Sequence, residues 1–475
     1  MIMKIILITK VLLSVLLVIS GCAVGPDYKR PDAPTSSSYK ELNGWREALP
    51  CDQKIGTKWW EAFGDPVLNT LAQQVNVSNQ SIALAESQYR QAQALTQLAR
   101  AGYFPTVSAG AAFTRSKAAG ENYSAINQHQ VSLNAAWELD LWGKVRRQVE
   151  GSTASAEASF ADLQAMRLSM QTELALNYFQ LQTLDAQKKN LNEAVGAYKK
   201  ALALTSNRYN AGVVAKTDVA AAQTQLQSAQ AQAIDVGVQR AQLEHAIAIL
   251  TGKPPADFSL PPWTFPQPQI KIPVVLPSDL LERRPDIASA ERKMAAANAQ
   301  IGVAKAAYYP SISLSGSLGY ASAGLASLFT TPTFFWALGP MALATTLFDG
   351  GARNARTEQV MAAYDGTVAF YRQTVLAGFK DVEDNLATLR ILDEEVQFQE
   401  LAVKSASESV LLTTNQYKAG VVSYLNVVTA QTIALTNERA AITVSGQRLK
   451  AAVLLVKALG GGWNTPETTP DINKK

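Results

Sequence analysis

The chain has 475 residues, of which 47% are apolar and only 8% aromatic, and its formal net charge is +4. Many small and straight-chain residues with few aromatics favour packed helices over a compact mixed core. Two histidines and two cysteines are too few and too widely spaced for a zinc site, a haem attachment motif or a cysteine–histidine nucleophile pair. Lys and Arg form no run, so the charge gives no support for nucleic-acid binding.

The sequence carries no motif of a known catalytic centre. No nucleophile elbow, metal-binding motif or P-loop occurs in it. We therefore expect a protein that is not an enzyme, with no catalytic residues, no bound cofactor and no metal site.

Residues 1–21 have the pattern of a bacterial secretion signal. An early positive charge precedes an apolar run, Ile5 to Ile19, that is too short for a comfortable membrane span. The run ends in Ser20-Gly21-Cys22, which resembles the lipobox of bacterial lipoproteins, where the signal is removed before a cysteine whose thiol is acylated. This resemblance makes Cys22 a lipidation site with a covalent lipid such as palmitate. The alternative is an ordinary signal peptide followed by a chance cysteine.

Residues 22–60 are predicted to form a lipidated, extended N-terminal arm, because Pro, Ser and Asp recur in them. By resemblance to known sorting rules, Ala23 after the cysteine permits transfer to the outer membrane. The second cysteine, Cys51, has no intrachain partner once Cys22 is acylated. A free thiol is unusual in an oxidising compartment, so a bystander role and a redox or disulfide role both stay open for Cys51.

Short segments of alternating polarity precede each helical half. Residues 106–114, 131–138 and 311–320 place apolar side chains at every second position and mainly small polar ones between them. A fourth segment, 336–347, alternates poorly because it contains Gly339-Pro340. Segments of about ten residues with one apolar and one polar face match transmembrane β-strands. A soluble sheet packed on helices is the alternative.

The number of these segments bears on the oligomeric state. Four strands cannot close a barrel, and an open sheet edge in lipid is very costly because its hydrogen-bonding groups have no partner. Two chains would give about eight strands, whose interior fills with side chains. Three would give about twelve, which leaves room for a water-filled lumen. If the protein is a channel, the strand number therefore predicts a homotrimer.

Two proline-free stretches predict long helical hairpins. No proline occurs between positions 105 and 254, or between 340 and 466. Apolar residues recur there at spacings of three and four, which is typical of coiled-coil-like helices. They are Leu163, Met166, Met170, Leu174, Tyr178, Leu181 and Leu184, and then Val368, Val375, Phe379, Val382, Leu386 and Leu389. The first helix is predicted to run from about residue 144 to about residue 209.

The two halves of the chain repeat, with an offset of about 205–208 residues. Residues 204–224 and 412–432 share 12 identities in 21 positions. A repeat of this length indicates duplication of a supersecondary unit rather than a solenoid. The predicted segments after the arm are a first repeat (61–253: a helix, two strands and a long hairpin), a proline-rich crossover (254–285), a second repeat (286–460) and a tail (461–475).

The lipobox, the repeat and the crossover together resemble the TolC-like outer-membrane factors. The most specific stretch is Leu276-Pro277-Ser278-Asp279-Leu280-Leu281-Glu282-Arg283-Arg284-Pro285-Asp286-Ile287, followed by Ala306-Ala307-Tyr308-Tyr309-Pro310. Within that family the chain is most similar to the lipoprotein (NodT/OprM-like) branch, which serves resistance-nodulation-division (RND) efflux pumps. The resemblance covers essentially the whole mature chain.

The resemblance implies a mainly α fold with a transmembrane β-barrel. The expected assembly is a trimer with a twelve-stranded β-barrel, four strands per chain, on a long α-helical barrel with a mixed equatorial domain. The implied function is a passive outer-membrane duct that exports drugs or other small molecules, contributes to antibiotic resistance and is opened at its periplasmic helix tips. The implied partners are two further copies, a periplasmic adaptor, an inner-membrane RND transporter and outer-membrane lipid.

The resemblance also assigns roles to residues beside the helix tips. Acidic residues there help to close the channel in the family, and the matching positions here are Asp218, Asn426 and Thr429. Asn and Thr offer only neutral hydrogen bonds, so we expect weaker cation sensitivity than in relatives with an acidic ring. Alternatively, Asn426 is a solvated residue outside the constriction. The implied adaptor contacts are Ala211, Gly212, Val213, Ala419, Gly420 and Val421.

Three further interpretations complete the sequence analysis. Arg283 to Asp286 are interpreted as structural, because Pro285 suits the first turn of a helix and Asp286 favours its positive end. The same fold could serve heavy-metal efflux or type I-like secretion, since selectivity usually lies in the inner-membrane partner. A structural coiled-coil lipoprotein without a pore is the third possibility, but it would not need the alternating segments.

Overall fold

The computed structural model describes residues 23–34, 36, 38–41, 58–117, 124–262 and 284–461. It is mainly helical with one antiparallel sheet, and it divides into two compact units. The described residues of unit 1 fall within 23–32, 88–160 and 289–372, and those of unit 2 within 33–87, 161–288 and 373–475. Each unit therefore draws on both halves of the sequence. Cys22, Cys51 and Arg283 lie outside the described residues.

Three helix lengths, 22, 67 and 35 residues, each occur once per half. The pairs in that order are α3 (Gln80–Ala101) with α7 (Pro285–Ala306), α4 (Lys144–Asn210) with α8 (Ala352–Lys418), and α5 (Lys216–Leu250) with α9 (Tyr424–Ala458). Equal lengths in the two halves confirm the internal duplication. The predicted first long helix is also confirmed, and it ends one residue beyond the predicted position.

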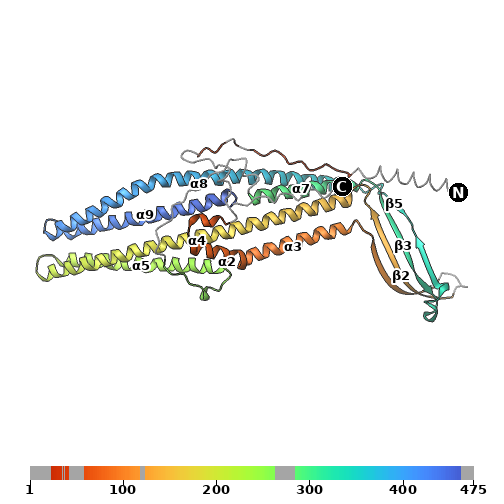
Figure 1. Ribbon diagram of the computed structural model, residues 1–475, viewed down its shortest axis with the longest axis horizontal. Coiled ribbons are helices and arrows are strands. Elements are labelled where there is room, and N and C mark those ends of the chain that lie inside the picture. Colours follow the sequence, from red (N-terminus) through yellow and green to blue (C-terminus); the bar gives the residue numbers. More distant parts are fainter. Residues whose placement is uncertain are drawn as a thin grey trace. The chain divides into compact units, whose positions relative to one another are not determined.

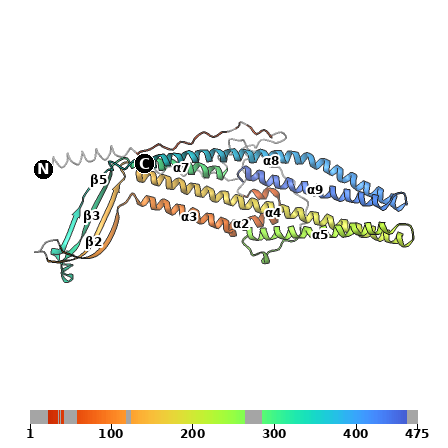
Figure 2. The same ribbon diagram turned by 180° about the vertical axis from the view of Figure 1, so that it is seen from behind.

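In unit 2, the helices α4 and α5 form one hairpin and α8 and α9 form another (Figures 1 and 2). The apolar stripes that the sequence predicted lie in the packed interior. Leu174, Leu181 and Leu184 of α4 are 0–3% exposed, and Val382 and Leu386 of α8 are fully buried. Burial of these stripes provides most of the stability of helices with such polar outer faces.

In unit 2, the segment formed by residues 59–78 packs against α4. The short 3₁₀ turn η1 (Trp59–Phe63) buries its three aromatic rings, and Trp59 donates a hydrogen bond to Gln171 at 3.0 Å. Asp65 caps α2 (Pro66–Ser78), because its carboxylate accepts two backbone N–H groups of the first turn. The same carboxylate accepts the hydroxyl of Tyr178 at 2.8 Å. The N-terminal cap therefore also fixes α2 to the long helix.

Arg284 joins three elements of unit 2. Its guanidinium donates to both carboxylate oxygens of Asp286 at 3.0 and 2.7 Å, to Asp381 of α8 at 3.2 Å and to the carbonyl of Ala458 at 3.3 Å. Pro285 is the first residue of α7, as the sequence predicted. The structural interpretation of this motif is confirmed for its described residues, and Arg284 adds long-range partners that the motif alone does not show.

Unit 1 contains an antiparallel sheet (Figure 1). The strand order is β1 (Thr106–Ser116), β2 (Ile126–Leu139), β3 (Ser311–Ser322) and β4 (Phe334–Leu338), with β5 (Ala342–Ala344) also paired to β3. The turns η3 (Leu325–Ser327) and η4 (Thr331–Thr333) lie between β3 and β4. The described start of the crossover, residues 254–262, contains the 3₁₀ turn η2 (Pro255–Asp257).

The fourth predicted strand is divided into β4 and β5. Gly339 between them has φ +114°, and Pro340 has no backbone N–H to donate to the ladder. The N–H of Gly339 still bonds to the carbonyl of Ser315 at 2.8 Å, so the two short strands stay on the same neighbour, β3. The other three segments form strands as predicted, each extended by a few residues.

The strand register sorts the side chains onto two faces, because successive residues point to opposite sides of a sheet. The apolar face contains Val107, Ala109, Ala111, Phe113, Val131, Leu133, Ala135, Trp137, Ile312, Leu314, Leu318, Tyr320, Phe334, Trp336 and Leu338. The small polar face contains Thr106, Ser108, Thr114, Ser116, Gln128, Gln130, Ser132, Asn134, Ser311, Ser313, Ser315 and Ser317, with Gly or Ala at several further positions. The predicted alternation is therefore confirmed across paired strands, and the register also places Arg115, Asn127, His129 and Ser322 on the mainly apolar face.

No helix in the described part of the chain is both long enough and apolar enough to cross a membrane.

Candidate functional site

Each hairpin of unit 2 ends in the same glycine-capped turn. After α4, the N–H of Gly212 bonds to the carbonyl of Tyr209 at 2.8 Å and that of Val213 to Arg208 at 2.8 Å. After α8, Gly420 and Val421 make the matching bonds, both at 3.0 Å. The two glycines have φ +76° and +79°, a left-handed conformation in which a side chain is strained. These helix caps explain why Ala-Gly-Val occurs in both repeats.

The turn residues are open to solvent in the described structure. All six predicted tip residues are exposed, and the side chains of Val213 and Val421 are 61% and 72% exposed. A Cβ added at Gly212 or Gly420 would meet nothing within 4 Å. The tips therefore present small, apolar, backbone-rich surfaces that another helical element can approach closely.

Behind the turns, the two hairpin tips of unit 2 pack against each other. Arg208 of α4 donates a hydrogen bond to the carbonyl of Tyr417 of α8, and its guanidinium lies 4.6 Å from the centre of the Tyr417 ring. That ring meets Tyr424 of α9 edge-on at 5.3 Å. Ala222 of α5 and Val427 of α9 complete the buried cluster. A charged group and two aromatic rings thus hold the four helices together one turn behind the exposed tips.

The three predicted gate residues occupy different environments. Asp218 lies half-buried in the first turn of α5, and its negative charge contributes to a raised pKa at Tyr424. Asn426 and Thr429 are exposed and share one face of α9, three residues apart. Thr429 bonds to the Leu425 carbonyl of its own helix at 3.0 Å. Asp218 is therefore partly buried, whereas Asn426 and Thr429 belong to the surface.

Arg208, Tyr417 and Tyr424 are residues of this site for which the sequence alone predicted no role. The repeat held a usable signal, since Arg208 is replaced by Gln416 in the second half, and Lys216 of the first half by Tyr424. Differences of this kind between two copies of a motif indicate positions at which the two hairpins have different roles. Which side chains they contact could be seen only in the folded chain.

The first described residues of the arm are held within unit 1. The Arg147 side chain is 6% exposed and donates to the carboxylate of Asp27 at 2.7 Å and to the carbonyls of Val24 and Gly25 at 3.4 Å. The N–H of Val24 donates to the carbonyl of Trp142 at 3.0 Å. The segment that directly follows the predicted lipidation site is therefore fixed in place, and it contains no helix or strand.

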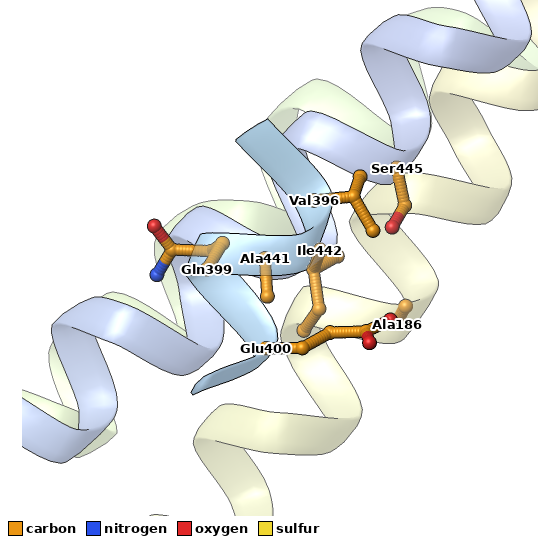
Figure 3. Close-up of a pocket in the computed structure, with 7 residues that line it drawn as sticks. All are labelled: Ala186, Val396, Gln399, Glu400, Ala441, Ile442 and Ser445. Carbon is orange, nitrogen blue, oxygen red and sulfur yellow. The ribbon is translucent and has the colours of Figure 1, made fainter. Parts of the chain in front are cut away.

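A shallow groove lies between α4, α8 and α9 in unit 2 (Figure 3). Its volume is about 270 Å³, and it is lined by Ala186, Val396, Gln399, Glu400, Ala441, Ile442 and Ser445. The side chains of its lining offer one carboxylate, one amide and one hydroxyl. In the part of the chain that the structure describes, no three His, Cys, Asp or Glu side chains are grouped to hold a metal ion.

Duplicated long hairpins with capped tips, together with a sheet that has one apolar and one small polar face, are the features that the resemblance to the outer-membrane factors implies. A family model described as "Outer membrane efflux protein" matches residues 71–253 and 276–461. The chain belongs to this family, and the predicted family resemblance is confirmed. The motif at the end of the crossover lies at the start of the second matched range.

Similar proteins agree with this assignment. The "Toluene efflux pump outer membrane protein TtgC" of Pseudomonas putida is 30% identical over 467 residues, which cover 96% of each chain. The "Antibiotic efflux pump outer membrane protein ArpC" of Pseudomonas putida has the same identity and coverage. The solved structure of the outer-membrane channel OprN has a TM-score of 0.88 at 29% identity and covers 93% of this chain and 100% of that one. The protein is thus an outer-membrane channel component of an efflux system.

Proposed function

We propose that three copies of this chain form one closed barrel and act as a passive duct from the periplasm to the exterior. Each copy supplies four strand positions, since β4 and β5 share one side of β3. The expected barrel therefore has about twelve strands, which leaves space for water along its axis. The main support for this proposal is the sheet, which has one apolar face, one small polar face and two edges that pair with no further strand among the described residues.

The sheet edges support closure by further copies. Within the described residues, the outer edge of β1 pairs with no other strand, and β4 and β5 form the opposite edge. The apolar face carries Trp336 and Leu338, which are 72% and 87% exposed in the single chain. Apolar side chains at such exposure suit lipid, but unpaired backbone groups do not. If β1 of one copy pairs with β4 and β5 of the next, the backbone groups at the edges gain hydrogen-bond partners while the apolar side chains stay in lipid.

The hairpin tips support a regulated periplasmic end. In this proposal, Asp218, Asn426 and Thr429 contribute to closure, and the exposed Ala-Gly-Val turns receive a helical hairpin of a periplasmic adaptor. The adaptor would connect the duct to an inner-membrane transporter of the RND class. Since closure would rest on few carboxylates, divalent cations should affect it weakly.

The N-terminus supports a covalent anchor. Cys22 would carry the acyl chains, and each buried CH₂ contributes roughly 0.8 kcal/mol to membrane binding, so several chains hold the protein firmly. The cargo would be drugs or other small molecules, because efflux components whose names specify antibiotics and toluene resemble this chain over nearly its whole length. No chemical step is part of the proposal, since the duct only provides a path.

Purification of the full chain in mild detergent tests the assembly. We expect the mass of a trimer by light scattering, a heat-dependent change of gel mobility, and ion conductance in planar bilayers. A monomer without conductance would overturn the proposal. Mass spectrometry of the N-terminal peptide tests the anchor separately: acyl groups on Cys22 are expected, and an unmodified thiol would refute the anchor while leaving the duct intact.

A further inference from the structure

The small polar face of the sheet is almost free of charge. Its positions hold Ser, Thr, Asn, Gln, Gly and Ala, with Ile126, Phe335 and Glu138 as larger exceptions. Four serines follow one another at alternate positions on β3, from Ser311 to Ser317. Across the middle of the sheet, Ser108, Asn134 and Ser317 form one cross-strand row. A solute beside this row would meet hydroxyl and amide groups only.

Among the paired strand positions that the structure describes, one ionisable residue occurs on this face. Glu138 lies near the end of β2, next to the start of α4, and its carboxylate pairs with Lys144 at 3.0 Å. The two side chains are 45% and 43% exposed, so each is still solvated and the pair has no net charge. The remaining strand positions of the small polar face add nothing to the charge. The whole face therefore sums to about zero charge at neutral pH.

We infer that this face lines the outer section of the duct and makes it indifferent to charge, so that cationic, anionic and uncharged small molecules pass it with similar ease. The inference rests on the proposed trimeric barrel and names the class of solutes that its outer section accepts. Any selection by charge would then be made elsewhere along the path.

The charge of a channel's lining determines which ions it selects, and this explains why an uncharged lining does not select by charge. A channel lined by one sign of charge concentrates counter-ions and excludes ions of like charge, which is how carboxylate or guanidinium rings produce selectivity. Hydroxyl and amide groups act both as donors and as acceptors, so they can solvate either sign of charge and neutral polar groups as well. Small side chains also leave the lumen wide. A lining of such side chains lets many kinds of solute pass and does not select among them by charge.

Thiol labelling from outside the cell tests this inference in the full-length protein. The background variant Cys51→Ser leaves only the acylated Cys22, and a single cysteine is then introduced as Ser317→Cys or, on the opposite face, Leu318→Cys. A cationic and an anionic methanethiosulfonate of similar size are added from the external side. We expect Ser317→Cys to react with both reagents and Leu318→Cys with neither.

For Ser317→Cys, the ratio of the two rates, corrected by the ratio for a free thiol, should lie within about threefold of one. An isosteric control adds charge to the same row. Asn134 is paired directly with Ser317, so Asn134→Asp places a carboxylate roughly 5 Å away. We expect this change to raise the ratio of cationic to anionic labelling on the order of tenfold.

Each outcome decides the matter. A corrected ratio beyond about tenfold in either direction without Asn134→Asp would overturn the inference but keep the barrel. Reaction at Leu318→Cys instead of Ser317→Cys would reverse the faces and overturn the proposed barrel itself. Reaction at neither position would mean that the small polar face does not line water, and would remove both.

Discussion

At the scale of single residues, Arg208 and Tyr417 show how two hairpins of similar sequence differ in the contacts that they make. The repeat places Gln416 where the first half has Arg208, so only one of the two hairpins carries a cation next to the tip. That cation reaches across to the ring and the carbonyl of Tyr417 in the other hairpin. A guanidinium over an aromatic face contributes about 0.5–2 kcal/mol, depending on burial. One side chain thus links the ends of two duplicated units.

Replacing Arg208 by the residue of the other repeat, Arg208→Gln, should loosen the tips. Loss of the ring contact and of the hydrogen bond to Tyr417 should cost about 1–2 kcal/mol. Amide hydrogen exchange in the last turns of α4 and α8 should then accelerate on the order of tenfold. Arg439→Gln is the matched control, because Arg439 makes an exposed bond to Gln232 far along the hairpin. Equal exchange in wild type and Arg208→Gln would contradict the link.

The raised pKa of Tyr424 predicts that the same cluster loses stability at high pH. Burial, the neighbouring phenols of Tyr417 and Tyr198, and the Asp218 carboxylate raise the pKa of Tyr424 to about 12. In the unfolded chain a tyrosine ionises near pH 10. Because the folded-state pKa is the higher one, the neutral phenol stabilises the fold fully below pH 10, and this contribution is lost as the pH rises from 10 to 12.

The thermal midpoint of the helical signal measures this effect. Between pH 10 and 12 the wild type should lose stability, by up to roughly 2 kcal/mol from this group. Tyr424→Phe cannot ionise, so its midpoint should fall less steeply across the same interval. Tyr209→Phe, at a position 42% exposed, should follow the wild-type curve. Identical slopes for wild type and Tyr424→Phe would show that Tyr424 does not control the transition.

At the scale of elements, the arm and the start of α4 depend on glycine for their close approach. Gly302 lies inside α7, where a Cβ would come within 2.7 Å of the Arg147 side chain and 3.0 Å of the Val24 carbonyl. Gly25 of the arm has φ +106°, and its added Cβ would meet the Gly302 backbone at 2.5 Å. The arm therefore fits unit 1 only because both surfaces lack side chains at the contact.

Gly302→Ala should release the first residues of the arm. Displacing Arg147 weakens its bonds to Val24, Gly25 and Asp27, so proteolysis within residues 24–32 should become faster than in the wild type. Gly196→Ala is the control: it is the same substitution inside α4, with nothing within 4 Å of the added Cβ. That variant should be neutral or slightly more stable, by about 0.5–1 kcal/mol. An arm equally protected in Gly302→Ala and wild type would refute this packing argument.

Elements with strong local signals could be predicted from the sequence, whereas their long-range partners could not. The alternation from Val107 to Phe113 and the stripe from Leu163 to Leu184 follow from local periodicity, and both elements formed as predicted. The capped turn at Gly212 also follows from local chemistry. The bonds from Arg284 to Asp381 and Ala458 join residues that are 97 and 174 positions apart in the sequence. No spacing rule connects such residues, because the fold alone brings them together.

At the scale of the whole molecule, the two faces of the sheet differ in the surroundings that suit them: the apolar face suits lipid and the small polar face suits water. A charge on the face turned to lipid is costly, about 2–4 kcal/mol for Arg near the membrane centre, while a lumen position keeps it in water. Leu133 and Asn134 are neighbours on β2 whose side chains point to opposite faces. They therefore form a matched pair for testing the orientation of the sheet in the membrane.

In the proposed trimeric barrel every copy would carry this penalty, so Leu133→Arg should reduce the amount of heat-modifiable trimer in outer-membrane fractions severalfold. Asn134→Arg adds the same side chain one residue further on, and it should assemble at a level close to wild type, since water solvates the guanidinium. Immunoblots of unheated and heated membrane samples provide the measurement. If both variants assembled equally well, the apolar face could not be the lipid-facing one, and the membrane orientation of the sheet would have to be reassigned.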